Sequence, residues 1–311
     1  MGFKTCYWSG WAQNLHLPKS GKTLLLTGRM YQMLPYVVHA TSLAMAARPF
    51  LAWKGVGGLL ALGNRLAGPF VLGLRGRSEK ALAEKGERIL KGIVAGLRGA
   101  GISPAFLYDD EPYSGVLLHD LGLENKIGSH VEKVYRLLKD RGVERVITVD
   151  PHTTHMLREV YPTYVKGFDI EVKHYLELLS EKADELAVRA GRDLPESFVL
   201  HDPCVMARDL GMIEEARKVA RKLGIQILEP ENAGLDTACC GGPVEYAFPD
   251  LSEQISLIRA KELAAVSKEV LVFCPICLMN LRKHERDLGM RVWDLGEALY
   301  ARMRGGRYDA G

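Results

Sequence analysis

Five of the six cysteines form one pattern in the second half of the chain: Cys204, Cys239, Cys240, Cys274 and Cys277. They are a single cysteine, a Cys-Cys-Gly triplet and a Cys-x-x-Cys pair. The first interval is 35 residues, from Cys204 to Cys239, and the second is 34, from Cys240 to Cys274. Such near-equal intervals predict three loops of one frame that converge on a point. Thiolates gathered in this way are ligands for zinc and iron–sulfur clusters.

Spacing alone leaves other chemistry open. Cys274 and Cys277 could cycle as a thioredoxin-type pair, and a free cysteine also packs as a small hydrophobic residue. A structural disulfide is disfavoured in a reducing cytoplasm. Structural zinc is the stronger rival, because four thiolates complete a tetrahedral zinc site.

Short apolar runs lead into the cysteine loops. Residues 198–200 precede Cys204, residues 270–273 precede Cys274, and a third run, 225–228, leads toward the Cys-Cys-Gly loop. Strands of this kind, separated by helical patterns, predict a parallel α/β layer. Ligands of open parallel sheets bind beyond the carboxyl ends of the strands, which is where these cysteines stand.

The pattern Cys-x34-Cys-Cys-Gly-x32-Cys-Pro-x-Cys resembles the cysteine-rich CCG domain of heterodisulfide reductase catalytic subunits, over residues 198 to about 283. The resemblance implies that the five cysteines bind a [4Fe-4S] cluster, which is noncubane in those reductases. In a succinate dehydrogenase relative, such a domain holds zinc. Cubane cluster, noncubane cluster and zinc therefore remain alternatives here.

Two residues beside the implied ligands draw attention. His201 either fills the core as a neutral residue or tunes the cluster by hydrogen bonding to a sulfur. Gly241, with its neighbour Gly242, lets the backbone approach a bulky group closely.

Members of this family often carry two such domains, and the first half is interpreted as a degenerate copy. Residues 24–29 (LLLTGR) parallel residues 199–204 (VLHDPC), and residues 146–153 parallel residues 270–277. The residues at the cysteine positions are Arg29, Tyr113, Ser114, Asp150 and Thr153. Together with His152 and His155 they predict a polar pocket. Either an Arg–Asp pair bridges its loops, or Arg29 and His152 serve a retained site for an anionic or redox-active small molecule.

The predicted fold is α/β, with two pseudo-repeated CCG-type domains that contain parallel sheets. Residues 1–190 form the degenerate domain and residues 191–311 the intact one. The first domain carries an apolar, glycine-rich helical insert at about 43–75, which either packs on the domain or docks a partner subunit or a membrane. Amphipathic helices are expected over 79–98 and 172–189, and a terminal helix over 293–300. His174, within the second of these, is expected to be a surface or interface residue rather than a ligand.

Composition narrows the function classes. Hydrophobic residues make up 47% of the chain and charged residues 25%, which excludes a disordered or fibrous protein. The balance of 41 basic and 38 acidic residues calls for no nucleic-acid surface. Neither a secretory signal nor a membrane-spanning run is evident. We expect a cytoplasmic protein that is also able to lie on the inner face of the membrane.

The function that follows is an iron–sulfur electron-transfer subunit of a heterodisulfide-reductase-like or related dehydrogenase complex. The sequence contains no Cys-x2-Cys-x2-Cys-x3-Cys-Pro run, the signature of ferredoxin-type clusters. Electrons should therefore come from a partner subunit that carries such clusters or a flavin. The loss of one cluster site puts disulfide cleavage in doubt, although a thiol or disulfide substrate stays open. The alternative is a zinc-binding anchoring subunit without redox turnover.

Overall fold

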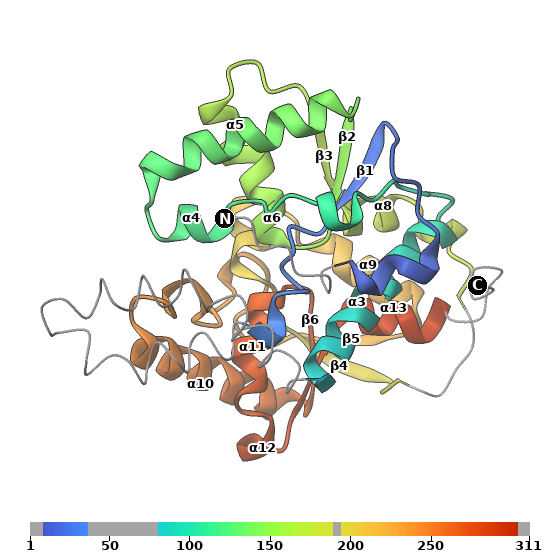
Figure 1. The fold of residues 1–311 in the computed structure, drawn as a ribbon. Coiled ribbons are helices and arrows are strands. Elements are labelled where there is room, and N and C mark those ends of the chain that lie inside the picture. The colour runs from blue at the N-terminus through green and yellow to red at the C-terminus, as the bar shows by residue number, and fades with distance from the viewer. Residues whose placement is uncertain (1–8, 37–79, 189–193, 304–311) are drawn as a thin grey trace, which may run out of the picture.

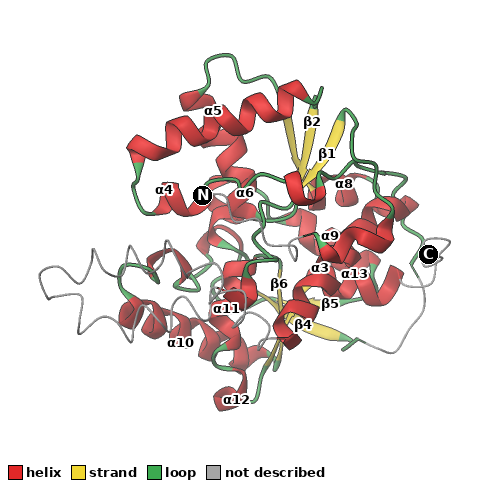
Figure 2. Ribbon diagram, in the orientation of Figure 1, coloured by secondary structure: helices red, strands yellow, loops and turns green. Residues whose placement is uncertain are grey.

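The computed structural model describes residues 9–36, 80–188 and 194–303. It contains two parallel sheets, one in each half of the chain (Figures 1 and 2). The first has the strand order β1-β2-β3 and the second the order β5-β4-β6-β7. The strands are β1 (Thr23–Leu26), β2 (Arg145–Thr148), β3 (Glu171–His174), β4 (Ser197–Leu200), β5 (Gln226–Leu228), β6 (Glu269–Val272) and β7 (Arg291–Asp294). The predicted α/β fold with parallel sheets is confirmed.

Both sheets follow one topology, so that β1, β2 and β3 correspond to β4, β6 and β7. The counterpart of β5 is a single residue, Ala105, which forms an isolated parallel bridge with Leu24 at the free edge of β1. The Ala105 carbonyl accepts a hydrogen bond from Leu25 N at 2.8 Å, and the Ala105 amide donates to Thr23 O at 2.9 Å. The first sheet therefore retains the place of a fourth strand without its length.

The helices repeat in the same order. Helix α3 precedes Ala105 as α9 precedes β5, α6 follows β2 as α11 follows β6, and α8 follows β3 as α13 follows β7. The helices are α3 (Lys80–Gly99), α4 (Val116–Asp120), α5 (Glu124–Asp140), α6 (Pro151–His155), α7 (Tyr161–Tyr164), α8 (Tyr175–Glu181), α9 (Glu214–Lys222), α10 (Pro249–Val266), α11 (Pro275–Arg282), α12 (Glu285–Leu288) and α13 (Leu295–Met303). Short 3-10 and π-helical turns connect several of them.

The strands are apolar because both faces of each sheet are buried. In β1, Leu24 and Leu26 face the core under α5, whereas Leu25 faces the core between the two sheets. In β2, Val146 and Ile147 alternate in the same way. The predicted amphipathic helix over 79–98 is α3, whose apolar face lies in the core between the sheets.

Four helices occupy the space between the sheets (Figure 1): α3 packs against α13, and α8 packs against α9. The two contacts are equivalent under the repeat, since each joins a helix of one half to a helix of the other. An ideal Cβ added to Gly92 of α3 would lie 1.9 Å from the Gly296 carbonyl oxygen of α13, so these backbones are in direct contact. One hydrophobic core continues from the first half into the second.

Two predicted helices were wrong in their first residues, and the helix expected over 172–189 also ends early, as α8 at Glu181. Residues 171–174 form strand β3, and His174, which was expected at the surface or at an interface, is fully buried and caps α8. Its Nδ1 accepts a hydrogen bond from Leu176 N at 3.3 Å. Likewise residues 291–294 form β7, and α13 begins at Leu295. In both cases a buried strand runs directly into its capping residue, so no turn residue marked the boundary.

The expected insert at 43–75 and Cys6 lie outside the described residues. Among the helices that are described, none is long and apolar enough to span a bilayer.

Candidate metal centre

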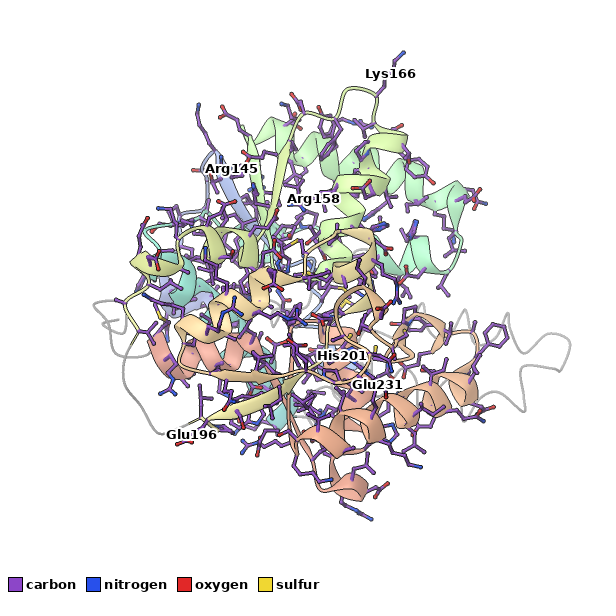
Figure 3. All side chains as sticks on the ribbon, turned by 180° about the vertical axis from the view of Figure 1, so that it is seen from behind. Arg145, Arg158, Lys166, Glu196, His201 and Glu231 are labelled. Atoms are coloured by element: carbon purple, nitrogen blue, oxygen red, sulfur yellow. The ribbon has the colours of Figure 1, made fainter. Side chains whose placement is uncertain are left out.

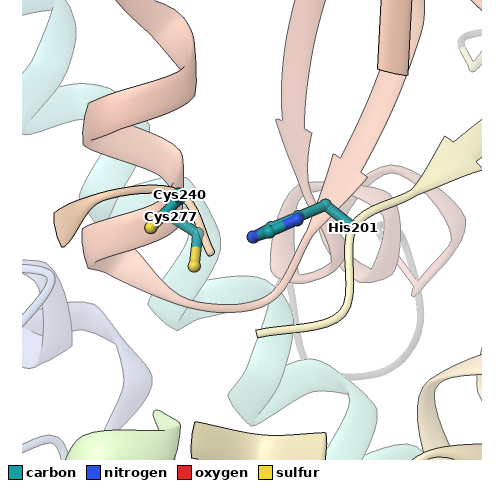
Figure 4. A group of neighbouring side chains, drawn as sticks. All are labelled: His201, Cys240 and Cys277. Carbon is teal, nitrogen blue, oxygen red and sulfur yellow. The ribbon is translucent and has the colours of Figure 1, made fainter. Parts of the chain in front are cut away.

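All three cysteine loops meet at the carboxyl edge of the second sheet. Cys204 lies four residues beyond the end of β4, and Cys274 lies two residues beyond the end of β6. The Cys204 and Cys239 Sγ atoms are 4.0 Å apart. Cys240 and Cys277 offer Sγ atoms within 4.8 Å of each other and of a His201 ring nitrogen (Figure 4). The five cysteines are free thiols.

Burial divides the five thiols into two groups. Cys240, Cys274 and Cys277 are buried, whereas Cys204 and Cys239 are partly exposed. The first three form the floor of the site and the last two form its rim. A group bound here would reach the outside between Cys204 and Cys239.

The start of α11 positions the Cys-x-x-Cys pair. Cys274 is the N-cap residue with extended backbone, and Pro275 occupies the first helical turn, where its missing N–H costs nothing. Cys277 then falls within the same turn. A helix N-terminus favours negative charge, so this placement favours a thiolate at Cys274. Hydrogen bonds with Cys240 and Cys274, together with burial, instead raise the pKa of Cys277.

The two glycines of the Cys-Cys-Gly-Gly loop are required by close contacts. Gly241 has φ of +82°, and a Cβ there would lie 2.5 Å from the Ser252 carbonyl oxygen. A Cβ on Gly242 would lie 2.0 Å from Ile276 Cγ2. The Gly241 amide donates to Cys239 Sγ at 3.3 Å. The glycines therefore allow the loop backbone to pack closely against Ser252 and Ile276, and they also allow the Gly241 amide to reach a cysteine sulfur.

Local hydrogen bonds bias two thiols toward the thiolate. Hydrogen bonds from Cys204, Cys240 and the Gly241 amide lower the pKa of Cys239. Burial alone would raise the pKa of Cys274, but hydrogen bonds from Cys277 and His152 lower it well below its ordinary value. The site therefore supplies negatively charged sulfur, the form that binds metal.

His152 reaches this site from the other half of the chain. It lies on α6, in the degenerate copy, and its ring interacts with the thiol of Cys274. Burial lowers the pKa of His152, but the hydrogen bond and the charge of Cys274 outweigh burial and raise it to about 9. A protonated His152 imidazole therefore contacts the buried Cys274 thiolate.

A buried ion pair braces the loop before Cys204. Asp202 accepts two hydrogen bonds from Arg217 of α9, at 2.9 and 2.8 Å, and one from the Gly234 amide at 2.7 Å. Arg217 also bonds both carboxylate oxygens of Glu229, at 2.7 and 2.8 Å. These contacts tie the loops that carry Cys204 and Cys239 to one helix.

His201 is fully buried at the end of β4, in the second half of the chain; Figure 3 shows it below Arg158, which belongs to the first half. The Nδ1 atom of His201 accepts a hydrogen bond from Arg259 Nε of α10 at 3.1 Å. Burial and the charge of Arg259 lower the pKa of His201 to about 3, so the ring is neutral.

In the first copy, the residues at the cysteine positions form a closed polar cluster. Ser114 and Thr153 place their hydroxyl oxygens 3.2 Å apart, as the aligned Cys240 and Cys277 place their sulfurs together. A Cβ on Gly28 would lie 2.1 Å from Thr153 Oγ1, so little room remains.

The other residues of this copy turn to local partners. Asp150 caps α6 through the Thr153 amide at 2.9 Å. Arg29 donates to the backbone carbonyls of Asp109 and Glu111, and Tyr113 accepts from the Leu117 amide at 2.7 Å. Of the predicted pocket, the structure brings Ser114, Asp150 and Thr153 together and directs His152 to the second copy.

Sequence reasoning missed Arg259 and the destination of His152. Arg259 lies 58 residues from His201 on a long helix of mixed composition, and no local signal marks it as buried. The contact of His152 depends on how the two halves pack. The alignment of the two copies alone could not place His152 beside the cysteine loops, because it does not say how the two halves pack.

The donor set fits an iron–sulfur cluster. Five sulfurs from three loops converge, two of them biased to thiolate, and His201 Nε2 is a buried ring nitrogen with no hydrogen-bond partner among the described residues. Soft ligands in this number are typical of clusters or zinc.

Comparison with known proteins points the same way. Residues 198–282 match the family model described as the cysteine-rich domain, CCG. The chain is 28% identical over 211 residues to a "Probable iron-sulfur-binding oxidoreductase FadF" of Bacillus subtilis, covering 65% of this chain and 30% of that protein. It is 27% identical over 231 residues to an "EtfAB:quinone oxidoreductase" of Syntrophomonas wolfei, covering 70% of this chain and 32% of the relative.

A third relative is one of the subunits of the dihydromethanophenazine:CoB–CoM heterodisulfide reductase of Methanosarcina acetivorans. It is 30% identical over 115 residues, which cover 36% of this chain and 28% of the relative. The matched part is thus about a third or less of each of these curated proteins. Residues 198–282 therefore match the CCG cysteine-rich domain family, and the relatives of the chain include a probable iron–sulfur-binding oxidoreductase and a heterodisulfide reductase subunit.

Proposed function

We propose that this chain is an electron-transfer subunit in which Cys204, Cys239, Cys240, Cys274 and Cys277 hold one [4Fe-4S] cluster. The convergence of five thiols at one sheet edge is the observation that carries the proposal. When bound, the cluster supplies one-electron transfer. The chain's residues hold it, bury three of its ligands and leave the Cys204–Cys239 rim partly exposed for exchange with a partner.

The partner in this proposal is a redox subunit with ferredoxin-type clusters or a flavin. Relatives named as an EtfAB:quinone oxidoreductase and as part of a heterodisulfide reductase support a role inside a multi-subunit complex. We place the chain in the reducing cytoplasm, and we assign any contact with a membrane subunit to segment 43–75. Heterodisulfide cleavage is not part of the proposed function, because the first copy has Ser114 and Thr153 at the positions of Cys240 and Cys277.

Anaerobically purified protein should contain about four iron and four sulfide ions per chain and absorb visible light. Cys240→Ser should lose most of the iron and the colour, because a buried floor ligand is removed. Cys6→Ser is the matched control, since it removes a thiol outside the pattern. Equal iron in both variants would contradict the proposal.

Zinc is the second candidate, favoured by the two pairs of neighbouring sulfurs, Cys240 with Cys277 and Cys204 with Cys239. Four thiolates complete a tetrahedral structural zinc site. About one zinc per chain, with no sulfide and no colour, would replace the electron-transfer proposal by an anchoring role.

A further inference from the structure

His201 points the edge of its ring at the sulfurs of the buried floor. One ring nitrogen and the Cys240 and Cys277 Sγ atoms lie within 4.8 Å of one another (Figure 4). The residue is held in place by its backbone amide, which donates to the Leu271 carbonyl of β6 at 3.0 Å. Because the side chain is fully buried, its ring has no access to solvent as an alternative partner.

The partner of Nδ1 decides where the ring proton lies. Arg259 Nε lies 3.1 Å from His201 Nδ1, and a guanidinium has donors and no acceptor. Nδ1 must therefore be the acceptor, so the proton of the imidazole is on Nε2. A neutral ring in this tautomer offers the sulfurs an N–H donor and no free lone pair.

Arg259 is fixed strongly enough to impose this tautomer. It is 1% exposed, pairs with Glu262 at 2.7 Å and lies 3.4 Å from the Thr237 hydroxyl. Thr237 in turn donates to the Asp202 carbonyl at 2.8 Å. Arg259 thus joins α10 to the loop that carries Cys204 and to the loop that carries Cys239 and Cys240.

The first copy lacks this arrangement. Leu26 stands where His201 stands in the second copy. The buried residues of α5, which occupies the place of α10, are Ile127, Val131, Val134 and Leu138. A buried histidine and arginine accompany the copy that keeps its thiols, whereas the copy without thiols has an apolar core there.

Nε2 of His201 has no hydrogen-bond partner among the described residues. A buried N–H without an acceptor is destabilising, so a group that accepts from it stabilises the site. We infer that His201 is a positioning residue that donates its Nε2–H to a sulfur of the bound cluster, in the tautomer imposed by Arg259, and is not itself a ligand. The inference rests on the proposed function.

Hydrogen bonds to cluster sulfur stabilise the more negative, reduced state and raise the reduction potential. His201→Leu removes the donor and should lower the potential while iron and sulfide content stay at the wild-type level. His201→Gln retains an N–H donor and should recover part of the shift. His284→Leu is the control, because that buried ring bonds the Ser256 hydroxyl instead, at 3.1 Å.

The measurement is a potentiometric titration followed by EPR, with exchangeable-proton ENDOR on the reduced protein in water and in deuterium oxide. We expect one exchangeable proton coupling to disappear in His201→Leu and to persist in His284→Leu. An unchanged potential and an unchanged coupling, with full iron, would overturn the inference. Loss of iron in folded His201→Gln and His201→Leu would overturn it too, since His201 would then be a ligand. Wild-type protein without iron would instead overturn the proposed function.

Discussion

Buried charges around the cysteines are held in pairs, and the side chains of those pairs fix the loops. Arg217 and Asp202 have side chains 7% and 1% exposed, and their contact at 2.8 Å lies two residues before Cys204. Desolvation makes such a pair a weak source of net stability, but removal of one partner leaves the other buried and unpaired. The loop before Cys204 should therefore depend on Arg217 more than on any surface charge of the same helix.

Arg217→Gln should lower the free energy of unfolding by about 3–5 kcal/mol, because Asp202 loses its bidentate partner. The measurement is urea denaturation followed by circular dichroism. Arg221→Gln on the same helix is the control, since Arg221 is 62% exposed and lies 3.7 Å from Glu214. That exposed pair should contribute less than about 1 kcal/mol. Equal losses in the two variants would show that the buried pair does not brace the loop.

The chemistry of the residues could be predicted where type and spacing suffice. The five cysteines follow a sequence pattern, and the strands before Cys204 and Cys274 were visible as apolar runs. Arg259 and the partner of His152 could not be predicted, because both depend on helices packed from distant parts of the chain. His174 was expected at the surface or at an interface because its neighbours suggested a helix, whereas a strand buries it.

At the scale of elements, the same cap is built twice. Strand β3 runs into His174 and α8, and β7 runs into Asp294 and α13. In each, a glutamate three residues on accepts from the capping residue's amide: Glu177 at 2.7 Å and Glu297 at 3.2 Å. The repeated cap shows that the two halves share local construction beyond their strand order. The sequence alignment of the two copies covered only the cysteine positions and the strands before them, because the capping residues, His174 and Asp294, differ in type.

Asp294 makes the second cap sensitive to pH. Burial raises its pKa to about 7, although the Gly296 amide and the Tyr31 hydroxyl, at 2.8 Å each, lower it. The carboxyl is protonated in the folded chain and ionised in the unfolded chain between about pH 4 and pH 7. The folded state therefore binds more protons there, and this contribution to stability is lost as pH rises toward 7.

Asp294→Asn should flatten the pH dependence of the unfolding free energy between pH 4 and pH 7. The change in slope should be at most about 1.4 kcal/mol per pH unit, the value for one proton. Denaturant titrations at a series of pH values measure it, with Asp287→Asn as a control whose side chain is 74% exposed. Parallel pH profiles for wild type and Asp294→Asn would contradict the prediction.

The contact of α3 with α13 depends on glycine at one position. A Cβ on Gly92 would meet backbone of α13, 1.9 Å from Gly296 O and 2.6 Å from Tyr300 N. A Cβ on Gly96 would meet leucine methyl groups at 3.1 Å, which can move. Gly92→Ala should destabilise by about 1–3 kcal/mol through overpacking. Gly96→Ala should change stability by less than about 1 kcal/mol, because alanine's helix propensity offsets the tighter contact. Thermal denaturation of the two variants compares them, and an equal loss would place the helices farther apart.

At the scale of the whole molecule, the two halves are joined by their own repeat. The pairs α3–α13 and α8–α9 cross the boundary in equivalent ways, and one core includes residues of both sheets. Tyr31 of the first half donates to Asp294 of the second, and His152 of the first half meets Cys274. The first copy has no cysteine at the aligned positions, yet its His152 contacts Cys274 of the second copy. The first copy therefore contributes a side chain to the place where the five cysteines converge.

A shared core predicts that the halves unfold together, although the sequence divides into two copies. Trp11 reports on the first half and Trp293 on the second, and both are buried in the shared core. We expect variants that retain one of these tryptophans, with the others replaced by phenylalanine, to give coincident fluorescence transitions in denaturant. Gly92→Ala should shift both transitions by the same amount, because the α3–α13 contact belongs to both halves. A Trp293 transition that stays in place while the Trp11 transition moves would mean that the cysteine-bearing half folds alone. In that case His152 would be an addition to a complete site, whereas coincident transitions make the first half part of the structure that holds the cysteines in place.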